Sequence, residues 1–179
     1  MRILLTNDDG ITAPGIAALY DALQGLGEIR VVAPADMQSA SSHGITFHHP
    51  LMVSEVQANP RMRGVAVEGR PADCVKLAAR CLWQEWYGVG ARPDLVVSGM
   101  NAGANVGINV IYSGTVGAAV EGAFLGIPSI AVSLHLGDRT KTQFARGAEI
   151  ARVAIDRILQ HPLDAHRVMN VNVPRTESP

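Results

Sequence analysis

The chain has 179 residues, and its 15 Lys and Arg side chains nearly balance its 16 Asp and Glu side chains. This balance argues against binding of duplex nucleic acid, because affinity for the phosphate backbone is built from clustered basic residues. Only 4% of the residues are aromatic, which disfavours a base-stacking platform, and no apolar run reaches the length of a membrane span. The length predicts one domain over residues 1–179.

Strand-like and helix-like patterns alternate along the chain. The predicted strands cover residues 2–6, 29–33, 51–56, 64–69, 94–99, 128–134 and 168–173. The predicted helices begin at Pro14 and Pro71 and cover about 115–125 and 141–160. Only a short polar stretch separates the third and fourth strands, so these two should pair antiparallel. The alternation predicts an α/β fold, with a mostly parallel sheet, helices on both faces and a small antiparallel excursion.

The two cysteines, Cys74 and Cys81, lie in one predicted helix, about 10 Å apart along its axis. That separation is too long for a disulfide, so both thiols should be reduced. Asp8 and Asp9 interrupt the first apolar stretch, which argues against a signal peptide. These features favour a cytoplasmic protein.

Polar segments follow the carboxyl ends of the predicted strands, where open α/β sheets bind their ligands. In chain order these segments are NDDG, DMQSASS, SGMNAGANVG and SLHLGD. Asp8 and Asp9, within NDDG, would point to opposite faces of an extended strand. Both reach one site only if the chain turns there, which Gly10 makes easy.

The adjacent carboxylates Asp8 and Asp9 allow three interpretations. The NDDG side chains cap the following helix, or an arginine on a nearby strand (Arg2 or Arg30) pairs with them, or they hold a hard divalent cation.

Two further oxygen donors, Ser39 and Asn101, follow neighbouring strands and would complete such a cation site. A loop serine and an asparagine between small residues are also ordinary turn formers, so neither is decisive by itself.

A second candidate feature is the helix start at Ser113, Gly114 and Thr115. Free backbone N–H groups and the positive end of the helix dipole favour a phosphate there, although a plain N-cap is the alternative. The glycines of the preceding segment recur every fourth residue, which is neither a dinucleotide fingerprint nor a P-loop. Hydride transfer and kinase-type chemistry therefore lack their usual sequence support.

A longer set of motifs is familiar in order and spacing: RILLTNDDGITAPGI, VVAPADMQSASSHGIT, EGRPADCVKLA, PDLVVSGMNAGANVG and VIYSGTVGAAVEGAFLGIPSIAVS. Over essentially the whole chain, these motifs closely resemble the SurE (survival protein E) family of metal-dependent nucleotidases. The resemblance implies a Rossmann-like, three-layer fold and hydrolysis of nucleoside 5′- and 3′-monophosphates, with short-chain polyphosphate as a further substrate. It also implies one Mg²⁺ or Mn²⁺ ion per subunit and a homodimer or homotetramer.

The resemblance also assigns roles position by position. The implied metal ligands are Asp8, Asp9, Ser39 and Asn101, with the two aspartates as the catalytic pair. The implied substrate-binding residues are Asn7, Asn105, Ser113, Gly114 and Thr115. Two further candidates are His43, which would protonate the leaving group, and Arg70, which would contact the phosphate or the nucleoside. An ordinary loop histidine and an exposed arginine are the alternatives for these two.

The chain departs from the family pattern at three places. Arg70 stands where a threonine is usual, and Ala40 stands where a glycine commonly follows the serine. Family members usually continue for several tens of residues beyond NVNVP, through a segment that contributes to oligomer contacts, whereas this chain stops at Pro179. We therefore expect either a shortened version or a fragment, with the C-terminal family segment absent.

Two chemical routes remain open at this stage. A water acidified by the cation attacks phosphorus, or Asp8 or Asp9 attacks it and forms an aspartyl phosphate. Two rival functions also remain: a module that binds a nucleotide without hydrolysing it, and an assembly protein with a vestigial metal site.

Overall fold

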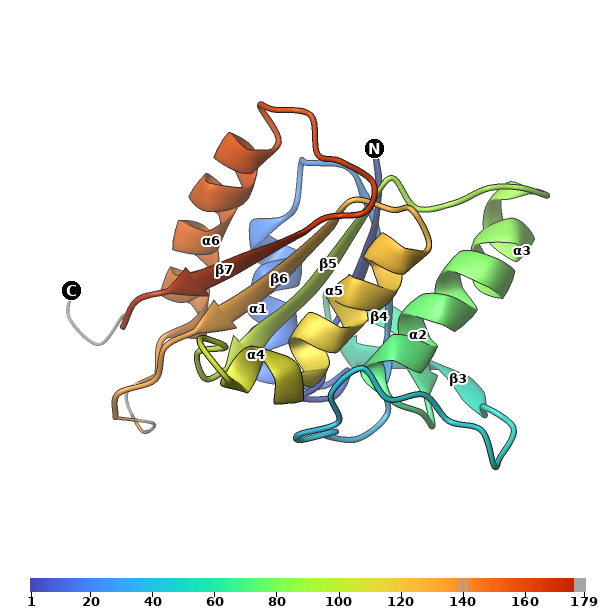
Figure 1. The fold of residues 1–179 in the computed structure, drawn as a ribbon, viewed down its shortest axis with the longest axis horizontal. Helices are drawn as coiled ribbons and strands as arrows, with labels where there is room; N and C mark the ends of the chain where they lie inside the picture. Colours follow the sequence, from blue (N-terminus) through green and yellow to red (C-terminus); the bar gives the residue numbers. More distant parts are fainter. Residues whose placement is uncertain (139, 141, 176–179) are drawn as a thin grey trace.

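A single sheet of seven strands organises the computed structural model (Figure 1), which describes residues 1–138, 140 and 142–175. The strands are β1 (Arg2–Thr6), β2 (Glu28–Pro34), β3 (Val53–Asn59), β4 (Met62–Val67), β5 (Leu95–Ala102), β6 (Ser129–Leu134) and β7 (Val168–Val173). The helices are α1 (Pro14–Ala22), α2 (Pro71–Leu77), α3 (Trp83–Tyr87), α4 (Asn109–Tyr112), α5 (Gly114–Phe124) and α6 (Phe144–Ile158). A π-helical turn, η1 (Ala78–Leu82), joins α2 to α3.

The strand order is β3-β4-β2-β1-β5-β6-β7, and every neighbouring pair is parallel except β3 with β4. Helices α1 and α6 cover one face of the sheet, and α2, α3 and α5 cover the other (Figure 1). The prediction of a three-layer α/β fold with one antiparallel excursion is therefore confirmed.

The central strand β1 is buried on both faces. Ile3 and Leu5 pack in the core beneath α1 and α6, whereas Leu4 packs with Val75 and Trp83 on the opposite face. A strand enclosed in this way needs apolar side chains at every position, which is why RILLT has no polar alternation.

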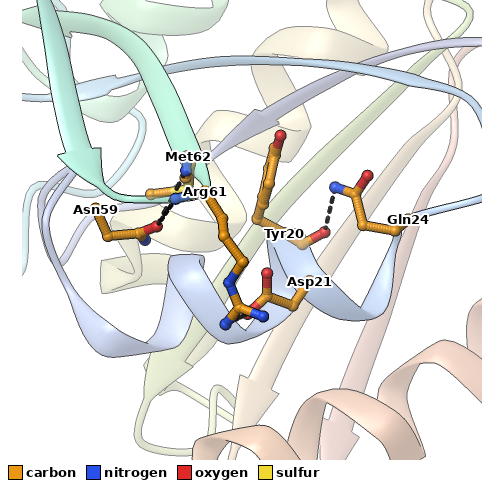
Figure 2. A network of polar contacts seen from close by, with 6 residues as sticks. All are labelled: Tyr20, Asp21, Gln24, Asn59, Arg61 and Met62. Carbon is orange, nitrogen blue, oxygen red and sulfur yellow. Dashed lines mark hydrogen bonds and ion pairs between the residues drawn. The ribbon is translucent and has the colours of Figure 1, made fainter.

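The hairpin β3–β4 is longer towards its turn than the sequence indicates, because a side chain closes that turn. Oδ1 of Asn59 accepts hydrogen bonds from the backbone N of Arg61 (2.9 Å) and of Met62 (3.0 Å) (Figure 2). The Arg61 guanidinium then lies 2.6 Å from the Asp21 carboxylate near the end of α1. The hairpin tip is thereby linked to the helix layer.

The helix predicted from Pro71 forms and continues through a π-helical turn. Val75 and Ala78 are buried, and Trp83 takes a buried position beyond that turn. Leu77 and Leu82 are only partly buried. Both cysteines are free thiols, as predicted. No helix in the described ranges combines the length and apolar character needed to span a bilayer.

Three of the four polar segments, NDDG, DMQSASS and SGMNAGANVG, line one cavity at the carboxyl end of the parallel strands, whereas SLHLGD contributes no residue to it. In Figure 1 the chain after β2, the short helix α4 and the tips of β5 and β6 gather at one end of the sheet. Helix α4 lies in the glycine-rich stretch, where the sequence shows no helical pattern.

Candidate functional site

The NDDG turn brings two neighbouring carboxylates to one place. Asn7 is fully buried, and its Nδ2 donates a hydrogen bond to the Gly10 carbonyl (2.8 Å). Gly10 has a φ of +97°, in the left-handed region that glycine adopts readily. Asp8 and Asp9 consequently both line the same cavity.

That cavity has a volume of about 450 Å³ and lies at the carboxyl end of the sheet. Its wall includes all four predicted metal ligands and two of the predicted substrate residues, which are Asp8, Asp9, Ser39, Asn101, Asn105 and Ser113. The rest of the wall comes from Met37, Ala40, Ala102, Gly103, Ala104, Asn109 and Tyr112. The fold therefore brings together the four predicted metal ligands from the turn after β1, the loop after β2, and β5.

Asp8 is the most deeply buried of the four predicted metal ligands, with only 8% of its surface exposed. Thr115 donates two hydrogen bonds to its carboxylate, from the backbone N to Oδ2 (3.0 Å) and from Oγ1 to Oδ1 (2.6 Å). Burial raises the pKa of Asp8 and the neighbouring charge of Asp9 raises it further, although the hydrogen bonds from Thr115 act in the opposite direction. Within the described chain, no basic side chain forms an ion pair with Asp8.

The capping interpretation does not hold for Asp8, and Ala13, the N-cap residue of α1, makes no side-chain capping hydrogen bond. Asp8 instead binds the first turn of α5, more than a hundred residues further along the chain. The salt-bridge interpretation is also wrong for Arg30, since that residue pairs with Glu28 (3.1 Å) at the opposite end of the strands.

Asn101 and Asp9 are oriented by backbone groups at the end of β5. Nδ2 of Asn101 donates to the Gly103 carbonyl (2.7 Å), so the amide oxygen is left for another partner. The backbone N of Ala102 donates to Oδ2 of Asp9 (3.1 Å). The β5–β6 register is irregular between Ser98 and Asn101, just where β5 reaches the cavity.

Ser39 reaches the cavity because its loop is fastened to other elements. The backbone N of Gln38 donates to the Asp8 carbonyl (2.7 Å). Ser42 donates from its backbone N to the Tyr112 carbonyl (3.1 Å) and from Oγ to the Ile111 carbonyl (2.7 Å), at the end of α4. This loop, residues 36–46, is called the serine loop below.

Two candidates suggested by the sequence lie outside this cavity. His43 turns towards α5, where its Nε2 lies 2.7 Å from the Glu121 carboxylate and its ring stacks on Phe124. Arg70 and His43 both line a different cavity, bounded by residues 43–49. Their geometry provides no contact with the cavity that Asp8 and Asp9 line, and their catalytic or binding roles stay predictions.

The expected phosphate-binding turn is only partly open to the cavity. Ser113 lines it, and its Oγ accepts a hydrogen bond from Val116 N (3.1 Å), which leaves the hydroxyl hydrogen for a ligand. Gly114 and Thr115 are buried and do not line the cavity, and both donors of Thr115 go to Asp8.

Two asparagines that the sequence analysis did not single out support the site. Asn170 and Asn172, on β7, bind the main chain of Asn105 in the cavity wall. The available signal was the alternation in VMNVNV, which places both asparagines on the same face of the last strand.

The residues present fit a hard divalent cation. Two carboxylates, a hydroxyl and an amide are oxygen donors of the kind that Mg²⁺ and Mn²⁺ prefer, and a cation would offset the charge of a carboxylate buried without an ion pair. No cluster of three or more His, Cys, Asp or Glu residues suited to a metal occurs in residues 1–138, 140 and 142–175. The predicted set differs from such clusters, because Ser39 and Asn101 supply half of its donors.

Comparisons with known proteins identify the family of the chain. The family model described as "Survival protein SurE" matches residues 3–179. The 5′-nucleotidase SurE of Carboxydothermus hydrogenoformans is 48% identical over 177 residues, covering 97% of this chain and 65% of the relative. That of Rhodopirellula baltica is 50% identical over 174 residues, covering 97% of this chain and 66% of the relative.

A crystal structure has the same fold. The SurE protein from Aquifex aeolicus superposes with a TM-score of 0.84 at 39% sequence identity, covering 98% of this chain and 66% of that one. The chain thus spans just under two thirds of the length of these relatives. On the family match over residues 3–179, the chain belongs to the SurE family.

Proposed function

We propose that this chain hydrolyses nucleoside monophosphates to the nucleoside and phosphate, using a divalent cation held by Asp8, Asp9, Ser39 and Asn101. The observation that carries the proposal is the convergence of these four oxygen donors, from three separate segments, on one cavity. The volume of about 450 Å³ is in the usual range for small-molecule sites. Relatives named 5′-nucleotidase SurE support a nucleotide as the substrate.

Mg²⁺ or Mn²⁺, when bound, would offset the negative charge of the phosphate and lower the pKa of a water molecule. The chain's own residues would then orient the ester. Ser113 would donate its hydroxyl hydrogen to a phosphate oxygen, because the hydroxyl oxygen already accepts from Val116. Asn105, which also lines the cavity, would add its side-chain amide.

The two aspartates would have different roles. Both oxygens of Asp8 accept hydrogen bonds from Thr115, which makes Asp8 a fixed anchor and a weak nucleophile. An aspartyl phosphate, if one forms, would therefore form on Asp9. Trapping and mapping a phosphoenzyme distinguishes this route from attack by water.

The test is phosphate release from nucleoside 5′- and 3′-monophosphates and tripolyphosphate, with Mg²⁺, Mn²⁺ or a chelator. We expect chelation to abolish release and Asp9→Asn to lower kcat/KM by on the order of a hundredfold or more, since a metal contributes several kcal/mol. Asp164→Asn is a matched control, because Asp164 is an exposed partner of Arg167 outside the cavity.

Three results would separate the alternatives. Release that persists in chelator, or that Asp9→Asn leaves intact, would refute the proposed metal site. Nucleotide binding without release would favour a binding module. The 3′-monophosphate and tripolyphosphate reactions test the two finer substrate proposals, which are activity beyond the 5′-monophosphates.

A further inference from the structure

Asn105 lies in the irregular segment between β5 and α4, yet three of its polar groups are held by other parts of the sheet. Its backbone N donates to Oδ1 of Asn172 (2.8 Å). Its carbonyl accepts from Nδ2 of Asn170 (2.9 Å) and from Nδ2 of Asn172 (3.2 Å). Its side-chain Nδ2 donates to Ser133 Oγ (2.9 Å).

The pattern of β7 explains how one strand makes these contacts. Val171 and Val173 pack in the core beneath α1 and α6, so the alternating Asn170 and Asn172 face the α5 side. In the β6–β7 register Asn172 is opposite Ser133. The residue that binds the main chain of Asn105 is therefore next to the residue that binds its side chain. Nδ2 of Asn172 also donates to Oδ1 of Asn170 (3.3 Å), which joins the two amides.

The hydrogen bonds of these two asparagine side chains have a single external target. Within the described residues, each one goes either to Asn105 or to the other asparagine. Asn105 itself is only 6% exposed and lines the cavity. One hydrogen of its Nδ2 is used by Ser133, which leaves the second hydrogen and the amide oxygen for a ligand.

We propose that Asn170 and Asn172 are positioning residues, which hold the main chain of Asn105 so that its side-chain amide meets the phosphate ester. The inference rests on the proposed phosphoesterase function. It makes the last described strand a part of the site, although neither asparagine lines the cavity. We call the two side chains the asparagine clamp.

The first experiment removes the donors of the clamp with little change in shape. Asn170→Asp and Asn172→Asp each replace an N–H donor to the Asn105 carbonyl with a carboxylate oxygen. We expect kcat/KM for a nucleoside 5′-monophosphate to fall about 10- to 100-fold, as for other residues that orient a ligand-binding group. Mn²⁺ affinity should stay near the wild-type value, because the four proposed metal ligands are untouched.

Matched variants separate positioning from charge. Gln160→Glu adds the same charge at an exposed position after α6 and should behave as the wild type. Asn170→Gln keeps an N–H donor on an exposed side chain and should retain more of kcat/KM than Asn170→Asp. Equal loss in these two Asn170 variants, or wild-type kcat/KM in both Asp variants, would overturn the proposal.

A double-mutant cycle tests whether the effect passes through Asn105. In the Asn105→Ala background, Asn172→Asp should lower kcat/KM by less than about twofold further, because the group it positions is gone. Losses that multiply in full would overturn the proposal.

An activity-independent measurement keeps the clamp distinguishable from the proposed function. Amide hydrogen exchange at Asn105 should accelerate at least about tenfold in Asn172→Ala, which removes the acceptor of its N–H, while the amide of Leu4 in β1 stays protected. A wild type that releases no phosphate refutes the proposed function and leaves this measurement to decide on the clamp. Unchanged exchange at Asn105 overturns the clamp in either case.

Discussion

At the scale of single residues, Asp8 shows why a buried carboxylate favours the binding of a cation. Removing a carboxylate from water disfavours its charged form, and the adjacent Asp9 adds repulsion. The two hydrogen bonds from Thr115 compensate only in part, because the pKa of Asp8 remains raised. A buried carboxylate that no described basic side chain neutralises is well suited to bind a cation from solution.

The raised pKa of Asp8 predicts how the stability of the metal-free protein depends on pH. An acid whose pKa is raised by folding stabilises the fold fully below its unfolded-state pKa, and that contribution is lost as the pH rises through the raised value. With chelator present, the wild type should therefore lose more free energy of unfolding than Asp8→Asn as the pH rises from below the usual pKa of aspartate to neutrality. Urea denaturation at the two pH values measures this difference. Parallel pH profiles for the two proteins would contradict a raised pKa.

A second residue-scale prediction concerns Ala40, which has a φ of +52°, in the left-handed region that favours glycine. A left-handed conformation costs a non-glycine residue about 1–2 kcal/mol. Replacement by glycine removes this cost, but glycine also makes the unfolded chain more flexible, which cancels part of the gain in stability. Ala40→Gly should raise the free energy of unfolding by up to about 1 kcal/mol. Ala17→Gly, within α1, should lower it by about 1 kcal/mol. Destabilisation by both variants would show that the left-handed turn is not strained.

At the scale of elements, the serine loop depends on close packing against α5. A Cβ placed on Gly117 would lie 2.3 Å from the Ser42 carbonyl oxygen and 3.1 Å from Cα of His43. Both neighbours are backbone atoms, so neither can move without moving the loop. The loop also carries Ser39, which connects the packing of α5 to the proposed metal site.

Gly117→Ala should therefore weaken Mn²⁺ binding, measured by calorimetry, even though alanine is the better helix former. We expect a loss on the order of tenfold, comparable to removing a group that orients a metal ligand. Gly147→Ala is the control, because its Cβ would meet only side-chain atoms of Leu134 and Met100 at 3.1 Å or more, on α6. Wild-type Mn²⁺ affinity in Gly117→Ala would show that the packing of the serine loop against α5 does not affect metal binding.

The elements themselves were largely predictable, because each buried strand and amphipathic helix carries its own periodic pattern. The misses have local physical causes. The hairpin boundary depended on the Asn59 side chain closing the turn, and α4 is a single turn within a glycine-rich segment. The docking of the serine loop could not be predicted, since its partners Tyr112 and Glu121 are far away in sequence.

At the scale of the whole molecule, the candidate site exists only when the sheet is assembled. Adjacent Asp8 and Asp9 are visible in the sequence, and strand order explains why Asn101 joins them, since β1 and β5 pair directly. No local pattern shows the contact of Asp8 with α5. The alternation in VMNVNV places Asn170 and Asn172 on one face of β7, but it does not show that they bind Asn105. Together these contacts make the site a junction of the central and edge strands.

Because the site joins segments that are far apart in the sequence, we predict that a divalent cation stabilises the fold. The proposed ligands come from the turn after β1, the serine loop and β5, so the unfolded chain cannot present them together. Cation at about 100 times its Kd should add about 2.7 kcal/mol, which raises Tm by roughly 5–11 °C for a domain of this size. Calorimetry with Mn²⁺ measures the shift, and NaCl at matched ionic strength is the control. The shift should disappear in Asp9→Asn, and an equal rise in that variant would place the stabilising cation elsewhere on the molecule.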